Sequence, residues 1–130
     1  MPAAELQKVG KIRDRQYQAI IDAAIEEFSR KGFKATSVQA IANRVSTSKA
    51  NIHYYFKNKE TLYREVLDHI VLLWNSSFDQ IQADEAPAVA LERMIRAKVS
   101  LSYTHASASR LFANEILQGA IHLEDYLRNT

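Results

Sequence analysis

Apolar residues recur along most of the chain at intervals of three and four, which is the pattern of one face of an α-helix. The first such stretch runs from about Arg13 to Lys31, and Gly32 follows it as a glycine that ends a helix would. Its apolar face consists of Tyr17, Ile20, Ile21, Ala24, Ile25 and Phe28. No segment alternates apolar and polar residues as a half-buried strand does. The pattern therefore predicts an all-α chain.

Two short helices are predicted after Gly32. Ser37 is a good N-cap for a helix of about two turns, and a second short helix begins near Ser48 and runs to about Tyr55. We expect the buried contacts between them to come from Ile41, Ala42, Val45, Ile52 and Phe56.

A longer fourth helix is predicted to begin after Asn58, which can cap it, and to continue to about Gln80. Its apolar positions are Leu62, Val66, Ile70, Leu73, Trp74 and Ile81. Residues 83–87 break this periodicity, so a boundary is expected there.

A fifth helix is predicted to follow, because Pro87 suits the first turn of a helix. Its periodic positions are Leu91, Ile95, Val99 and Ser102. Ser107 or Ser109 is expected to begin a sixth helix that Gly119 stops, and residues 122–130 resemble the opening of a seventh.

Composition narrows the class of protein. The chain is 47% hydrophobic and 25% charged, as in ordinary globular proteins, so collagen-like and strongly disordered classes are excluded. The absence of cysteine leaves no disulfide framework and no thiolate metal site. No stretch resembles a signal peptide or a bilayer-spanning helix, and we predict a cytoplasmic protein. The first ten residues are expected to be disordered or to become ordered only on a partner.

The small net charge of +2 conceals two different halves. Residues 1–60 hold 11 Lys and Arg against 6 Asp and Glu, whereas residues 61–130 hold 6 against 9. This asymmetry suits a region that binds a polyanion, attached to a body with another task, although a solvated surface would also explain it.

Two short helices after a longer one can form a helix-turn-helix, in which one helix crosses the DNA backbone and the next enters the major groove. Residues 37–56 offer this arrangement within an ordered series: Gly32-Phe33, Thr36-Ser37-Val38, Ile41-Ala42 and Ser48-Lys49-Ala50-Asn51-Ile52-His53-Tyr54-Tyr55-Phe56-Lys57-Asn58-Lys59-Glu60-Thr61-Leu62-Tyr63. With this series, residues 13–65 resemble the TetR family of bacterial transcriptional repressors.

The resemblance implies a three-helix DNA-binding domain in residues 1–60 and the start of a helical ligand-binding and dimerisation domain in residues 61–130. The fourth helix would join them. TetR relatives have more helices than this chain accommodates, so we expect the dimerisation helices to be missing. The complete protein would bind a near-palindromic operator as a homodimer and release it when a small-molecule effector binds.

The resemblance also implies which residues meet DNA. Bases and phosphates would be contacted by Lys49, His53, Tyr54 and Tyr55, and the DNA backbone would be held by Thr36, Ser48 and Lys59. Ala50 belongs to the same exposed set. The chemistry is suitable, because lysine can meet guanine acceptors or phosphates, and hydroxyl groups can donate to phosphate oxygens.

Two positions depart from the family pattern. The turn carries Val45-Ser46-Thr47 where Ala-Gly-Val is usual, so a left-handed backbone at Ser46 would cost about 1 kcal/mol relative to glycine. Ala50 stands where glycine is common. These departures concern the turn geometry and the operator sequence rather than the motif itself.

The segment from Ser107 to Ala120 is similar to the regulators of pyrimidine utilisation within the family, although Ile121 replaces the proline usual after Gly-Ala. A pyrimidine-like effector is therefore expected. Its pocket would draw on Trp74, Phe78, Tyr103 and Asn114, all of which packing or surface positions explain equally well. No cofactor or metal is expected, because the histidines show no ligand spacing.

Other classes of protein account for the sequence less well. No glycine-rich phosphate loop, Gly-x-Ser-x-Gly or His-Glu-x-x-His is present, and the adjacent pairs Glu26-Glu27 and Asp84-Glu85 have the character of surface charges, so no enzyme is predicted. A membrane-surface helix is disfavoured by the acidic polar face of the first helix. A helical protein-interaction module without DNA-binding activity remains the alternative.

Overall fold

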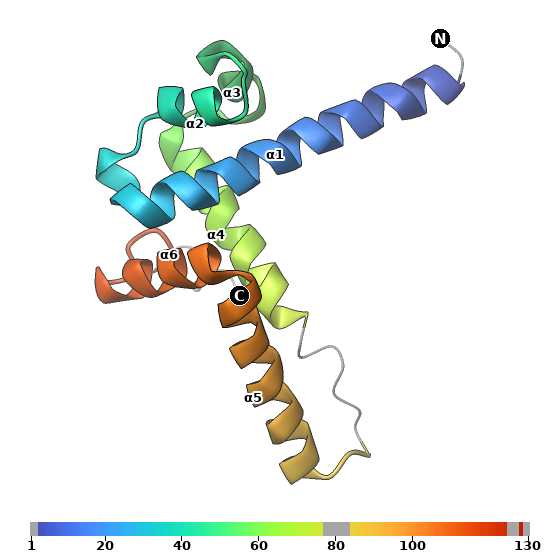
Figure 1. Cartoon of the computed structure of the whole chain (residues 1–130), viewed down its shortest axis with the longest axis vertical. Coiled ribbons are helices and arrows are strands. Elements are labelled where there is room, and N and C mark those ends of the chain that lie inside the picture. Colours follow the sequence, from blue (N-terminus) through green and yellow to red (C-terminus); the bar gives the residue numbers. More distant parts are fainter. Residues whose placement is uncertain (1–2, 77–83, 125–127, 129–130) are drawn as a thin grey trace. The chain divides into compact units, whose positions relative to one another are not determined.

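The computed structural model describes residues 3–76, 84–124 and 128, and this part of the chain is helical and contains no strand (Figure 1). The predicted all-α class is confirmed. Internal contacts divide the chain into two units, residues 1–63 and 64–130. The helices are α1 (Ala3–Ala35), α2 (Val38–Arg44), α3 (Lys49–Tyr55), α4 (Lys59–Asn75), α5 (Pro87–Thr104) and α6 (Ala106–Leu117).

Helix α1 is interrupted at Gly32, where its end was predicted, continues to Ala35 and begins earlier than predicted. Gly32 has a φ of 82° and interrupts the helical backbone near its end, which is a conformation that glycine adopts without a steric cost. The first ten residues were expected to be disordered or to become ordered only on a partner, whereas in the structure residues 3–10 belong to α1. Alanine, glutamate, leucine, glutamine and lysine, all strong helix formers, fill positions 3–8, and this local preference explains the longer helix.

Serine side chains cap both short helices. Ser37 Oγ accepts a hydrogen bond from the Ala40 backbone N–H at 3.0 Å, and Ser48 Oγ accepts one from Asn51 at the same distance. Ser46, in the turn between these helices, has a φ of 55° and is therefore left-handed. Predictions of both caps are thus confirmed, and the turn carries the backbone conformation for which glycine is better suited.

The core of the first unit lies where α1 is covered by α2, α3 and the start of α4. Phe28 sits at its centre, with its ring centroid 4.9 Å from that of Tyr63 and 6.2 Å from that of Phe33. The residues expected to make the contacts between the two short helices are all buried except Val45, which is half-buried. The buried apolar residues of this unit are Ile20, Ile21, Ala23, Ala24, Phe28, Val38, Ile41, Ala42, Ile52, Phe56, Leu62 and Tyr63.

Glu27 is a buried carboxylate in this core, with 6% of its surface exposed. Its Oε1 accepts hydrogen bonds from Nε and Nη2 of Arg44 at 3.0 and 2.9 Å, and its Oε2 lies 3.3 Å from Lys31 Nζ. The hydrogen bonds from Arg44 hold the pKa of Glu27 below its ordinary value, outweighing the effect of burial. The interpretation of Glu27 as a surface charge is therefore wrong, because it pairs α1 with α2.

The second unit contains most of α4 together with α5 and α6. Asn58 Oδ1 accepts a hydrogen bond from the Thr61 N–H at 2.8 Å, so the predicted cap of α4 is confirmed. Helix α4 ends at Asn75, while the predicted end near Gln80 lies outside the described residues. Pro87 occupies the first turn of α5, as expected.

Helix α6 differs from the prediction at its start. It begins at Ala106 rather than at a serine, and His105 precedes it without a side-chain capping bond. Gly119, at a φ of 95°, follows its end as predicted. Of the expected seventh helix, residues 125–127, 129 and 130 lie outside the described part of the chain.

The apolar face predicted for α5 exists but is uncovered. None of its residues is buried, and the side chains spaced four apart along it are each more than half exposed: Leu91, Ile95, Val99 and Tyr103.

The left-handed turn generates a prediction about stability. Replacing Ser46 with glycine should raise the free energy of unfolding by about 1 kcal/mol, because the Cβ that strains this backbone is removed. Denaturant titration of the two proteins measures the difference. Ser46→Ala, which keeps the Cβ, is the control and should give no gain; an equal gain in both variants would contradict the backbone explanation.

The Glu27–Arg44 pair generates a prediction about pH. Because the pKa of Glu27 is lower in the folded than in the unfolded protein, its contribution is complete above about pH 4.3 and is lost as the pH falls through the folded pKa. Glu27→Gln should cost about 1 kcal/mol near neutral pH, a figure reduced for the solvent screening of the partly exposed Arg44. Unfolding curves measured between pH 7 and 3 should show a shallower loss of stability in the variant, whereas Glu26→Gln should keep the wild-type slope.

Candidate nucleic-acid interface

Helix α3 presents one polar face to solvent. Lys49 and His53 are four residues apart, as are Ala50 and Tyr54, so these two rows lie side by side on the helix. All four residues are exposed, and Tyr54 is exposed over 65% of its surface. Ile52, on the opposite side, is buried.

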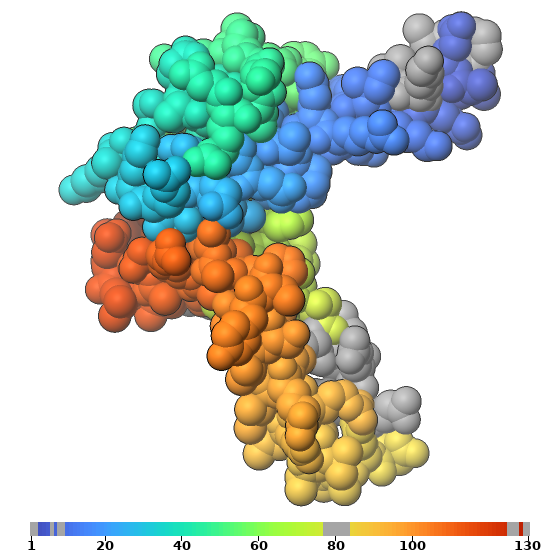
Figure 2. All heavy atoms as spheres, in the orientation of Figure 1, coloured from blue at the N-terminus to red at the C-terminus, as the bar shows by residue number. Residues whose placement is uncertain are grey.

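In the space-filling view, α2 and α3 (green) lie side by side against α1 (blue) (Figure 2). Ser48 is exposed at the start of α3 and its oxygen accepts the capping bond, so its hydroxyl proton remains available to a phosphate. His53 Nδ1 lies 3.3 Å from the Phe56 carbonyl oxygen, which orients the ring.

Tyr55 turns toward α1 instead of joining this polar face. It is half-buried, and its hydroxyl donates a hydrogen bond to Gln16 Oε1 at 2.8 Å. Its ring centroid lies 6.5 Å from that of Tyr17 in an edge-on arrangement. The structure thus separates the two adjacent tyrosines, with Tyr54 outward and Tyr55 against α1.

Thr36 is placed inside the unit, with 2% of its surface exposed. Its Oγ1 lies 2.7 Å from the Gly32 carbonyl oxygen and 3.2 Å from that of Glu27, and it donates to these acceptors. The side chain therefore ties the residues before α2 to the end of α1, and the hydroxyl points away from solvent.

Lys59 spans the start of α4 and the end of α1. Its Nζ donates to the Phe33 carbonyl oxygen at 2.8 Å and lies 4.5 Å from the centroid of the Phe33 ring. The ammonium group satisfies one of the carbonyls in the last turn of α1, which lack partners within the helix. Of the eight residues expected at DNA, five therefore lie exposed on or beside α3, and three, Thr36, Tyr55 and Lys59, bond to other parts of the unit.

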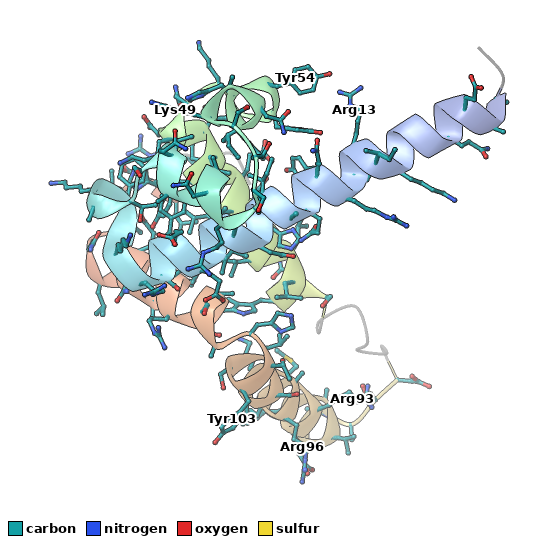
Figure 3. All side chains as sticks on the ribbon, turned by 45° about the horizontal axis from the view of Figure 1, so that its top comes forward. Arg13, Lys49, Tyr54, Arg93, Arg96 and Tyr103 are labelled. Carbon is teal, nitrogen blue, oxygen red and sulfur yellow. The ribbon has the colours of Figure 1, made fainter. Side chains whose placement is uncertain are left out.

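Sequence reasoning missed the contacts that α1 makes with the end of α3. Arg13, expected only as the start of the first helix, has its Cζ 5.6 Å from the centroid of the Tyr54 ring (Figure 3). Tyr17, described as an apolar position, has its ring 5.3 Å from that of Phe56. These pairs are about forty residues apart in sequence, so no local pattern signals them.

The structure places three of the four residues expected to line an effector pocket. The Trp74 ring packs edge-on against Phe112 with centroids 4.3 Å apart, whereas Tyr103 is 83% exposed and Asn114 is exposed. Phe78 lies outside the described residues.

Glu115 and His122 form a pair that the sequence did not indicate. Glu115 is 2% exposed, and its Oε1 lies 2.9 Å from His122 Nδ1 while its Oε2 accepts the His122 backbone N–H at 3.1 Å. The carboxylate thereby holds the chain that follows α6.

The described ranges contain no group of three or more histidine, aspartate or glutamate side chains able to hold a metal ion. No helix within them has the length and apolar character needed to cross a bilayer.

Comparison with known families assigns both parts of the chain. Residues 20–66 match the bacterial regulatory proteins of the tetR family, and residues 67–130 match the C-terminal region of YcdC-like proteins. The chain belongs to the TetR family. The family resemblance of residues 13–65 is thereby confirmed.

Two regulators illustrate the similarity within the TetR family. The chain is 41% identical over 110 residues to the HTH-type transcriptional regulator RutR of Escherichia coli K12, covering 85% of this chain and 52% of RutR. It is 29% identical over 110 residues to the HTH-type transcriptional repressor NicS of Pseudomonas putida KT2440, covering 84% and 52%. The chain thus spans about half the length of these relatives. Residues 107–120, which carry the subgroup resemblance, lie within the part of the chain that matches YcdC-like proteins.

Solved structures of TetR proteins share the fold. A TetR-like regulator from Rhodococcus sp. RHA1 aligns with a TM-score of 0.77 at 22% identity, covering 86% of this chain and 61% of that one. A TetR family regulator from Marinobacter aquaeolei VT8 aligns with a TM-score of 0.70 at 22% identity, covering 81% and 56%.

The placement of Thr36 generates a prediction. Thr36→Val keeps the shape and removes the hydroxyl, so it should lower the free energy of unfolding by about 1 kcal/mol. Because the hydroxyl points inward, the affinity of the folded variant for DNA should not change. A variant of wild-type stability that binds all DNA sequences more weakly would instead identify Thr36 as a phosphate contact.

Proposed function

We propose that this chain is the DNA-binding region and the beginning of the effector-binding region of a ligand-responsive transcriptional repressor. The observation that carries the proposal is the exposed polar face of α3, formed by Lys49, Ala50, His53 and Tyr54 over the buried Ile52. A helix with such a face, held on a buried scaffold, suits insertion into the major groove. The sequence similarity to RutR and NicS, both transcriptional regulators, supports the same function.

In the proposed complex, different residues at α3 contact the bases and the phosphates. The ammonium of Lys49 meets guanine acceptors or a phosphate, and the Nε2 of His53 and the hydroxyl of Tyr54 meet polar groups of bases or backbone. Ser48 donates its hydroxyl proton to a phosphate. The scaffold residues Thr36, Tyr55 and Lys59 act indirectly, by holding the first unit in the shape that presents α3.

The charge distribution favours approach to DNA. The first unit, residues 1–63, contains 11 Lys and Arg but only 6 Asp and Glu. A basic surface raises the rate of encounter with a polyanion and accounts for binding without sequence preference. Specificity would then depend on the side chains of α3.

The complete protein is proposed to work as a cytoplasmic homodimer that places two copies of α3 in successive major grooves of a near-palindromic operator. A small-molecule effector, pyrimidine-like by resemblance, would bind the C-terminal region and favour a conformation with a different spacing of the two helices. Operator affinity would then fall by the free-energy difference between the two conformations. The chain by itself would bind one half-site weakly, because the advantage of two linked half-sites is missing.

Selection from random duplex DNA at two salt concentrations tests this function. The chain should enrich a short motif, and Lys49→Gln should weaken binding to that motif by about tenfold, since a good base contact contributes roughly 1–3 kcal/mol. Lys98→Gln removes the same charge from α5 and serves as the matched control. Salt-sensitive binding without enrichment would indicate a basic helical domain that does not read sequence, and no binding would favour a protein-interaction module.

A further inference from the structure

Tyr54 is exposed to solvent, but its ring is contacted by two other side chains. Its ring is exposed on the last turn of a seven-residue helix, and such a side chain would ordinarily sample several rotamers. Here, however, the guanidinium of Arg13 lies over one face of the ring, with Cζ 5.6 Å from the centroid (Figure 3). The Tyr55 ring meets Tyr54 edge-on, with centroids 5.2 Å apart. The Tyr54 ring is therefore held from two directions.

Arg13 belongs to a set of three residues on α1 that all contact the end of α3. Gln16 accepts a hydrogen bond from the Tyr55 hydroxyl, and the Tyr17 ring packs on Phe56. Positions 13, 16 and 17 share one face of α1, because residues three and four apart are neighbours on a helix. The contact of Arg13 with Tyr54 is therefore the outermost of a row that fixes α3 on α1.

The surroundings of Arg13 favour a positioning role over a direct phosphate contact. A hollow of about 270 Å³ lies beside it, lined by Gly10, Arg13, Asp14, Tyr17 and Tyr55. The carboxylate of Asp14 in this lining opposes the entry of an anion. Arginine has a planar cation that stacks well on aromatic rings, so the ring of Tyr54 is the natural partner of this side chain.

We propose that Arg13 is a positioning residue for operator recognition, which holds the Tyr54 ring in the orientation that meets DNA. The inference rests on the proposed DNA-binding function of α3. Fixing a side chain before binding removes part of the entropy that association would otherwise cost. A cation stacked on an exposed aromatic ring should change affinity for the selected DNA motif by about two- to fivefold.

A double-mutant cycle on the full chain tests the coupling of these two residues. Arg13→Gln removes the cation, Tyr54→Phe keeps the ring, and Tyr54→Leu removes it. Affinities are measured for the motif enriched by the wild-type chain and for unrelated DNA, at two salt concentrations. Arg15→Gln is the matched control, because it removes the same charge from an exposed residue two positions along α1, about 200° away around the helix.

The proposal requires Arg13→Gln to lower motif affinity two- to fivefold beyond the effect of Arg15→Gln, in the wild type and in Tyr54→Phe, but not in Tyr54→Leu. An equal loss in all three backgrounds, with a salt slope lower by about 0.9 than in Arg15→Gln, would overturn it and make Arg13 an independent phosphate contact. No loss beyond the control would also overturn it. A wild-type chain that enriches no motif would be a failure of the proposed function itself.

A measurement without DNA keeps the test valid if Tyr54→Leu binds too weakly for a cycle. In nuclear magnetic resonance spectra of the free chain, a guanidinium over the ring should show an upfield ring-current shift of the Arg13 Nε–H proton. The shift should persist in Tyr54→Phe and disappear in Tyr54→Leu. An Arg13 resonance that is the same in all three proteins would overturn the proposal.

Discussion

The position of α3 depends on side-chain contacts with α1, because α3 is only seven residues long and a helix of that length is not stable alone in water. Its buried side, Ile52 and Phe56, lies in the core that α1 dominates. Its last turn is braced by the hydrogen bond from Tyr55 to Gln16. Helix α2, equally short, is joined to α1 through the bonds from Arg44 to the buried Glu27. The orientation of the exposed face of α3 is therefore set by a long helix that contributes little to that face itself.

This arrangement explains why Thr36 and Lys59, which the family resemblance places at the DNA backbone, form hydrogen bonds within the first unit instead. Thr36 and Lys59 lie at the junctions of α1 with α2 and with α4, and each bonds to a carbonyl oxygen near the end of α1. Gly32 breaks the helix at that end and leaves carbonyl groups that need new partners. Polar side chains supply them, so part of the family pattern serves the scaffold, whereas the polar row on α3 stays exposed.

The sequence predicted those parts of the fold that depend on neighbours in the chain. The caps Ser37, Ser48 and Asn58, the break at Gly32 and the first turn at Pro87 each have a local cause, and the structure has all five. The inward hydroxyl of Thr36 and the burial of Glu27 were not predicted, because Thr36 also bonds to Glu27, nine residues away, and Glu27 bonds to Arg44, seventeen residues away. The contacts of Arg13 and Gln16 with α3 span still longer separations. The exposed face of α3 was expected from its spacing, but the inward turn of Tyr55 depends on α1.

The serine caps of α2 and α3 have a consequence for how this unit responds to acid. A hydroxyl group does not titrate, so the capping bonds of Ser37 and Ser48 keep the same strength across the acidic range. The junction of α1 with α2 contains an ionised carboxylate and does titrate. Acidification therefore weakens the attachment of α2 to α1 and leaves the serine capping bonds unchanged. Because a helix of seven residues is not stable alone in water, loss of that attachment would loosen α2 even though its cap is unaffected.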